Sequence, residues 1–291
     1  MKTTNNTSPY ILKGTEVRDG AGVRILRLFG STGTFNFTDP FLLLDFFGSN
    51  NPDEYLMGFP WHPHRGIETL TYLISGSVEH EDSLGNSGKL RSGEIQWMTA
   101  GSGIFHQEMP KPEKNNPEMF GFQLWINLPK ARKFSKPVYR NVGVSKLKSL
   151  KFDGVEMKII SGSYQGNPSS ALEDHPLNIE YLDVVSNGRS LTIKKKSGFT
   201  GLVIPVDGEV LANGATIKKG ETGVFTGNES SIEIESKNRA RFVYISGART
   251  NENIAWYGPI VMNNWSEIKQ AFDDLRNGKF VRDSSPTFIS Y

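Results

Sequence analysis

The sequence predicts an all-β protein, built as one large β domain or two ordinary ones, with one short helix near the C-terminus. Short β-prone runs such as VRILRLFG, TLTYLISGSVEHED, GLVIPVDG and ARFVYISG are separated by Gly, Asn, Asp and Pro. This spacing fits a sandwich or barrel better than alternating strands and helices. The 291 residues are enough to bury a sizeable core in either arrangement.

The segment NNWSEIKQAFDDLRNGKF breaks the strand pattern. Its apolar residues recur at helical spacing, at Trp265, Ile268, Phe272 and Leu275. Asn264 or Ser266 is a candidate N-cap, and Gly278 follows the last turn. We therefore expect one amphipathic helix here, whose role is packing.

Composition narrows the classes of function. Thirty-three basic and 31 acidic residues give a formal charge of +2, which predicts no surface dedicated to nucleic acid or membrane. The absence of cysteine excludes disulfides, thiolate nucleophiles and cysteine-ligated metal sites, so any metal must be bound by histidine and carboxylate. The first residues lack a signal-peptide core, and no apolar run reaches the roughly 18 residues of a membrane span. A cytoplasmic protein is expected.

The two halves of the chain resemble degenerate copies of each other. HRGIETLTYLISG, residues 64–76, has the glycine spacing of KSGFTGLVIPVDG, residues 196–208. The basic, proline-containing stretch 128–143 reads as a solvated linker. We therefore expect one domain over residues 1–135 and a second, carrying the helix, over residues 144–291. In this register Lys194 and Lys196 stand where the first copy has His62 and His64, so the second copy should bind no metal.

Two strand-spaced pairs are the candidate functional residues. FPWHPHRG contains His62 and His64, and GIFHQEMP contains His106 and Glu108. Residues i and i+2 of a strand point to the same face, so each pair can present two ligands to one point. If the strands face each other, three nitrogens and one carboxylate can bind a metal.

Aromatic and apolar residues near these pairs could form a dry pocket wall, namely Phe59, Trp61, Trp97, Met98 and Phe105. Other polar residues have simpler interpretations. His80 and Asp82 are expected to structure a turn, with a role behind the metal ligands as the alternative, and His175 is expected to be exposed in a loop. Arg65 should point away from the ligands if its strand stays regular.

The block GFPWHPHRGIETLTYLISGSVEHEDSLGNSGKLRSGEIQWMTAGSGIFHQEMP, residues 58–110, closely resembles the signature of the pirins, a branch of the cupin superfamily. The resemblance extends to GFQLWINLP (121–129) and YGPIVMNN (257–264). It implies a bicupin, two tandem β-barrels with a mononuclear iron in the N-terminal barrel only. Pirin iron ligands carry over to His62, His64, His106 and Glu108. The general cupin pattern places the glutamate ligand at Glu68 instead of Glu108. We expect Glu68 to lie behind the ligands or in the core.

Three imidazoles and one carboxylate suit Fe(II), manganese, nickel, copper or zinc, and iron is favoured by the resemblance. Some pirins are similar in activity to quercetin 2,3-dioxygenases, which implies a small aromatic or enol substrate and dioxygen, with Glu108 as the base. The alternative is a non-catalytic, iron-dependent redox sensor or transcriptional co-regulator acting through a protein partner. A metal-dependent isomerase ranks third. Direct nucleic-acid and membrane partners are not expected.

Overall fold

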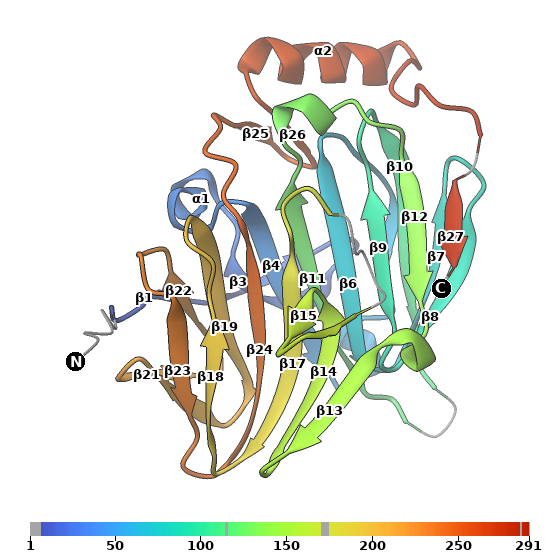
Figure 1. Cartoon of the computed structure of the whole chain (residues 1–291). Coiled ribbons are helices and arrows are strands. Elements are labelled where there is room, and N and C mark those ends of the chain that lie inside the picture. Colours follow the sequence, from blue (N-terminus) through green and yellow to red (C-terminus); the bar gives the residue numbers. More distant parts are fainter. Residues whose placement is uncertain (1–6, 114–115, 170–174, 286, 291) are drawn as a thin grey trace. The chain divides into compact units, whose positions relative to one another are not determined.

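The computed structural model describes residues 7–113, 116–169, 175–285 and 287–290 and consists mainly of β-strands (Figure 1). The chain divides into two compact units. The first barrel comprises Thr15–Thr34, Phe41–Val144 and Thr250–Tyr291, and the second barrel comprises Met1–Gly14, Phe35–Pro40 and Ser145–Arg249. Within the described residues, no helix combines the length and the apolar character needed to cross a membrane.

The first barrel contains an eight-stranded sheet in the order β2-β3-β4-β11-β6-β9-β12-β27, a four-stranded sheet in the order β5-β10-β7-β8, and a β25-β26 hairpin. Short 3-10 turns η1 (Pro52–Glu54) and η2 (Lys130–Arg132) lie between its strands. The strands are β2 (Thr15–Asp19), β3 (Val23–Phe29), β4 (Phe41–Ser49), β5 (Phe59–His64), β6 (Ile67–Ser75), β7 (Ser77–Asp82), β8 (Ser87–Arg91), β9 (Ile95–Thr99), β10 (Ile104–Lys111), β11 (Met119–Asn127), β12 (Val138–Val142), β25 (Ala255–Tyr257), β26 (Ile260–Met262) and β27 (Phe288–Ser290).

The second barrel contains a seven-stranded sheet in the order β1-β22-β19-β24-β17-β14-β13, a four-stranded sheet in the order β18-β23-β20-β21, and a β15-β16 pair. The turn η3 (Val144–Lys146) precedes β13. The strands are β1 (Tyr10–Lys13), β13 (Lys148–Phe152), β14 (Val155–Ser161), β15 (Ser163–Tyr164), β16 (Asn167–Pro168), β17 (Glu180–Asn187), β18 (Ser190–Lys194), β19 (Phe199–Asp207), β20 (Glu209–Ala212), β21 (Ala215–Lys218), β22 (Glu221–Phe225), β23 (Ser231–Glu235) and β24 (Arg239–Ala248).

The two barrels share one strand order, as the internal repeat predicted. Strands β3-β4-β11-β6-β9 of the first barrel correspond to β14-β17-β24-β19-β22 of the second. The repeat aligned residues 64–76 with 196–208, and the structure has nine-residue strands in equivalent places there, β6 (Ile67–Ser75) and β19 (Phe199–Asp207). The interior of the second barrel is an apolar cluster that includes Leu182, Ile193, Val203, Ile232 and Phe242.

The compact units are not the contiguous halves that the sequence suggested. Strand β1 pairs with β22 and so belongs to the second barrel, while the residues after 250 belong to the first. The stretch 128–143 is not a solvated linker either, because it contains β12, which pairs with β9. Lys133 in this stretch is buried, and its ammonium donates to Gly66 O, Asn127 Oδ1 and Val261 O. Burial lowers the pKa of Lys133 to about 7.

The predicted C-terminal helix is present as α2 (Trp265–Arg276). Asn264 is its N-cap and forms a capping box with Glu267. The helix buries Ile268, Ala271 and Asp274, whereas Trp265, which we placed on the apolar stripe, is exposed. A second helix, α1 (Thr32–Thr38), was not predicted, because its sequence TGTFNFT contains only weak helix formers.

Arg65 anchors α2 to the first barrel. Its guanidinium donates to Asp274 Oδ2 and Phe280 O, both at 2.8 Å, and lies 4.2 Å from the centre of the Phe280 ring. Asp274 also accepts from Gln270 and Arg282. Burial raises its carboxyl pKa, but the donors, Gln270 first and then Arg65 and Arg282, lower it to about 2. Gly66 permits the nearby approach of β26, because a Cβ at this position would lie 2.0 Å from Val261 O.

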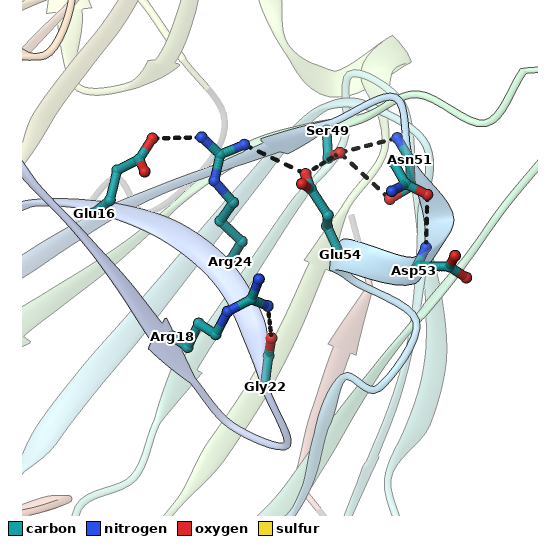
Figure 2. Close-up of polar contacts among 8 residues, drawn as sticks. All are labelled: Glu16, Arg18, Gly22, Arg24, Ser49, Asn51, Asp53 and Glu54. Carbon is teal, nitrogen blue, oxygen red and sulfur yellow. Dashed lines mark hydrogen bonds and ion pairs between the residues drawn. The ribbon is translucent and has the colours of Figure 1, made fainter.

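The β2–β3 hairpin is joined to the turn after β4 by surface polar contacts (Figure 2). Arg24 bridges Glu16 and Glu54, and Glu54 also accepts from the Ser49 hydroxyl at 2.6 Å. Exposed pairs of this kind contribute little to stability, because water and salt screen the charges. Their effect is to hold the hairpin that presents Asp19 and Arg27 to the cavity described below.

Candidate metal centre

Strand β10 brings the predicted pairs together. It lies between β5 and β7, and its pairing with β5 sets His106 opposite His62 and Ile104 opposite His64. The imidazole centres are 4.3 Å (His62–His106), 4.9 Å (His62–His64) and 5.0 Å (His64–His106) apart. One ligand atom of each histidine lies within 4.8 Å of the other two. The expected convergence of the two strands is therefore present for all three histidines.

Hydrogen bonds orient two of these rings for ligation. The Nδ1–H of His62 donates to Pro60 O at 2.8 Å, and that of His64 donates to Pro259 O at 3.1 Å. Since a backbone carbonyl can only accept, both rings keep the lone pair on Nε2. This is how metal-binding histidines are commonly held in one tautomer.

The third ring has unsatisfied nitrogens. His106 is fully buried, and neither of its nitrogens has a hydrogen-bond partner among the described residues. Buried polar atoms without a partner are rare and costly. A cation bound by the Nε2 lone pairs of the three rings would give His106 Nε2 a partner. Burial, followed by the proximity of His62, lowers the pKa of His64 to about 3 and that of His106 well below its usual value. Neutral imidazole is the form that binds metal, so the three histidines fit a divalent ion.

Glu108 lies beside this group in a cage of neutral donors. Gln123 donates to one carboxylate oxygen at 2.7 Å, and Thr71 and Gln96 donate to the other at 3.3 Å. The possible metal ligands fall into two overlapping groups, His62–His64–His106 and His80–His106–Glu108. The four predicted ligands are thus adjacent, but Glu108 groups with His106 and His80 rather than with all three histidines.

His80 contributes to the site, which was the less favoured of its two expected roles. It is buried on β7 opposite Glu108, its ring stacks on Tyr139 at 4.4 Å, and its Nδ1 accepts from Gln96 at 2.9 Å. The expected turn-structuring role holds for Asp82, which accepts from the backbone of Leu84 and Asn86. The alternation of buried and exposed residues in SVEHED could have revealed that His80 faces inward.

A cavity of about 560 Å³ opens on His62 and His64. Its volume falls within the roughly 300–1,000 Å³ of small-molecule sites. Trp61, Trp125 and Trp256 line it, and the Trp125 ring lies edge-on to His64 with their centres 4.8 Å apart. The cavity therefore combines the candidate ligands with an aromatic wall.

The predicted wall is only partly correct. Phe59 and Trp61 line the cavity, whereas Trp97 and Met98 are buried core residues and Phe105 packs on Phe280. Trp125 and Trp256, which do line the cavity, come from β11 and β25, and no local pattern connects them to the histidine strands.

The remaining predicted residues lie elsewhere. Glu68 is buried and accepts from Trp97 Nε1 and Thr99 Oγ1, which fits the core role left open for it. His175 is half-buried, and its Nδ1 accepts from the Leu177 amide.

The lysines aligned with the ligand histidines do not face the interior of the second barrel. Lys194 and Lys196 are exposed, and the buried lysine is Lys195, which donates to Phe199 O and Gly227 O. The internal repeat therefore aligns His62 and His64 with residues one position away from those that face the interior of the second barrel. Ile193, opposite Ile232, occupies the inward position.

Comparisons with known proteins agree with the resemblance seen in the sequence. The family model described as Pirin matches residues 22–126, and the Pirin C-terminal cupin domain matches residues 181–281. A Thermoplasma acidophilum protein named "Putative quercetin 2,3-dioxygenase" is 40% identical over 262 residues, covering 83% of this chain and 99% of its own.

Solved structures show the same likeness. Quercetin 2,3-dioxygenase from Acinetobacter baumannii superposes with a TM-score of 0.87 at 29% identity, over 94% of this chain and 98% of its own. The bacterial pirin YhhW from Escherichia coli, in complex with nickel(II), superposes with a TM-score of 0.62 at 21% identity, over 82% of this chain and 98% of its own. At that identity the second likeness concerns the fold.

Proposed function

The chain belongs to the pirin family of cupin proteins, and on that basis we propose that it is a metal-dependent dioxygenase that opens the heterocycle of a flavonol or related enol. The observation that carries this proposal is an aromatic-walled cavity that opens on His62 and His64, two members of the three-histidine group. The name of the similar Acinetobacter baumannii structure supports the same reaction class.

The proposed ligands of the ion are His62, His64, His106 and Glu108. The orientation of two Nε2 lone pairs by Pro60 O and Pro259 O, together with the unsatisfied nitrogens of His106, supports the histidine part of this set. Fe(II) is the proposed metal, and manganese, nickel, copper and zinc are the alternatives that the same donors accept. When bound, such an ion supplies a Lewis acid that makes an enol hydroxyl easier to deprotonate.

Glu108 is the proposed proton acceptor. Its carboxylate is buried, adjacent to His106, and held by side-chain donors that leave it free of any cation among the described residues. A carboxylate in this position can accept the hydroxyl proton of an enol and return it to the product. Trp125 and Trp256, whose ring centres are 6.3 Å apart, can hold a flat substrate against the histidines.

The reaction balances without a further co-reactant. Two carbon–carbon bonds of the heterocycle break, both atoms of dioxygen enter the ring-opened ester acid, and the carbon that bore the enol hydroxyl leaves as carbon monoxide. The contribution of the protein is to position the substrate, to exclude water with the tryptophan wall, and to move one proton through Glu108.

The test is an oxygen-dependent assay with the purified protein. Protein loaded separately with each of the five metals is mixed with quercetin under air and under argon, and flavonol absorbance and carbon monoxide are followed. We expect loss of absorbance with release of carbon monoxide only under air and only with loaded protein. If none of the five metals supported oxygen-dependent turnover, the proposed activity would be rejected.

A further inference from the structure

A row of polar side chains crosses the inner face of the eight-stranded sheet. Strand pairing sets Arg27 beside Asp45, Asp45 beside Gln123, Gln123 beside Thr71, and Thr71 beside Gln96. Cross-strand partners share one face of a sheet, so these five residues form a continuous line, called here the polar row. Its Thr71, Gln123 and Gln96 members are the donors that hold Glu108.

The other end of the polar row is an ion-pair cluster. Arg27 donates to both oxygens of Asp45, at 2.9 and 2.8 Å, and also to Asp19 at 2.6 Å. Asp19, Arg27 and Asp45 all line the cavity that opens on His62 and His64. One guanidinium against two carboxylates leaves this wall with one net negative charge.

This cluster lies close to the candidate metal centre. Gln123 lines the cavity and binds Glu108, and Asp45 is its neighbour on the next strand. Adjacent strands are about 4.8 Å apart, so Arg27 is about 10 Å from Gln123 along the row. His62, His64 and Asp45 line the same cavity, so a flat ligand that reaches the histidines with one end can meet Asp45 with the other.

Asp45 retains hydrogen-bonding capacity in this position. A carboxylate has about four acceptor sites, and Arg27 occupies one on each oxygen of Asp45. The remaining sites can accept from hydroxyl groups of a ligand, whereas an anionic group would meet the net negative charge of the cluster.

We infer that Asp45 is a specificity-determining residue, which accepts hydrogen bonds from hydroxyls on the distal ring of an aromatic enol and excludes ligands carrying a carboxylate there. The inference rests on the proposed function for the identity of the enol end of the ligand. It adds a second recognition point that is independent of the metal ligands.

Ligand binding without turnover tests the inference. Zinc-loaded protein under argon is titrated with 3-hydroxyflavone, with its analogue bearing two distal-ring hydroxyls, and with its analogue bearing a distal-ring carboxylate. Quenching of the fluorescence of the cavity tryptophans reports binding. We expect the dihydroxy analogue to bind about tenfold tighter than the parent or better, since hydrogen bonds to charged acceptors are the stronger class, and the carboxylate analogue to bind more weakly than the parent.

Asp45→Asn should remove this selectivity. The hydroxyl advantage should fall below about threefold and the carboxylate analogue should bind as well as the parent, because the wall loses its net charge while the shape is kept. The matched control is Asp183→Asn. Arg241 donates to both oxygens of Asp183, at 2.9 and 2.6 Å, but this pair belongs to the second barrel and should leave all three affinities unchanged.

Asp19→Asn provides a second test if Asp45→Asn fails to fold, because the Asp19 side chain is half exposed at the cavity rim. This variant should bind the carboxylate analogue more tightly than the natural protein does. Equal affinity of the natural protein for all three ligands, or selectivity that persists in Asp45→Asn, would overturn the inference. Turnover without selectivity would reject the inference alone, and selectivity without turnover would reject the proposed reaction alone.

Discussion

Acidification should destabilise the metal-free protein through its buried histidines. Burial lowers the pKa of His64 to about 3 and that of His106 well below its usual value, whereas an unfolded histidine titrates near pH 6.5. Between pH 6.5 and about 3 the unfolded chain therefore binds a proton at His64 that the folded chain does not. This contribution to the free energy of unfolding is therefore fully present above pH 6.5, and it decreases as the pH falls below that value.

The size of this effect follows from proton linkage. Each such histidine changes the free energy of unfolding by about 1.4 kcal/mol per pH unit in that range. From pH 6.5 to pH 5 His64 alone removes about 2 kcal/mol, and His106, whose pKa is lowered in the same direction, adds to this loss. This is a large share of the roughly 5–15 kcal/mol that stabilises a typical domain.

Urea unfolding of chelator-treated protein at pH 7.5 and at pH 5 measures this difference. His106→Gln should reduce the pH-dependent loss, because glutamine does not titrate. His175→Gln, a change in a half-buried loop residue of the second barrel, is the control and should keep the full loss. If His106→Gln showed the same pH dependence as the control, the assignment of this loss to the buried histidine cluster would be wrong.

Three further predictions concern the metal and the C-terminal helix. His62→Ala combined with His64→Ala should abolish stoichiometric metal in elemental analysis and leave a folded β protein by circular dichroism; retained metal would disprove the ligand set. Glu108→Gln should keep weak metal binding but lose turnover, because an amide cannot accept the proton, and unchanged turnover would require another base. Arg65→Met should lower the free energy of unfolding by about 1.5–3 kcal/mol, because buried Asp274 loses this charged hydrogen bond but keeps Arg282, whereas a loss below about 1 kcal/mol in urea unfolding would show that the pair is not important for stability.

The parts of the site that could be predicted from the sequence are those with a local signature. The i, i+2 spacing of His62 with His64 needs only strand geometry, and the register of β5 with β10 then joins them to His106. Helix α2 was likewise predicted because its periodicity and its Asn264 cap are contained in one short segment. The absence of cysteine restricted the candidate ligands to histidine and carboxylate.

The rest depends on contacts between distant segments. Gln96, Gln123 and Thr71 converge on Glu108 from three strands, and the sequence gives no reason to connect them. Trp256 likewise lines the cavity, although its strand lies nearly 200 residues after His62 in the sequence. The domain boundary was misplaced for the same reason, since a strand can complete a sheet built from residues far away in the chain.

The two barrels show why the polar row is better explained by function than by folding. The equivalent strands β17, β24 and β19 carry Leu182, Tyr244 and Val203 side by side, and all three belong to the apolar core of the second barrel. The same strand order is thus formed with apolar residues at these positions, so the architecture does not require amides and carboxylates there. Polar groups in an interior cost free energy even when they are hydrogen-bonded in part, and departures from a consistent apolar core are expected at functional sites. The polar row of the first barrel is such a departure, and it joins Glu108 to the cavity wall at Asp45, the point where we expect the ligand to be distinguished.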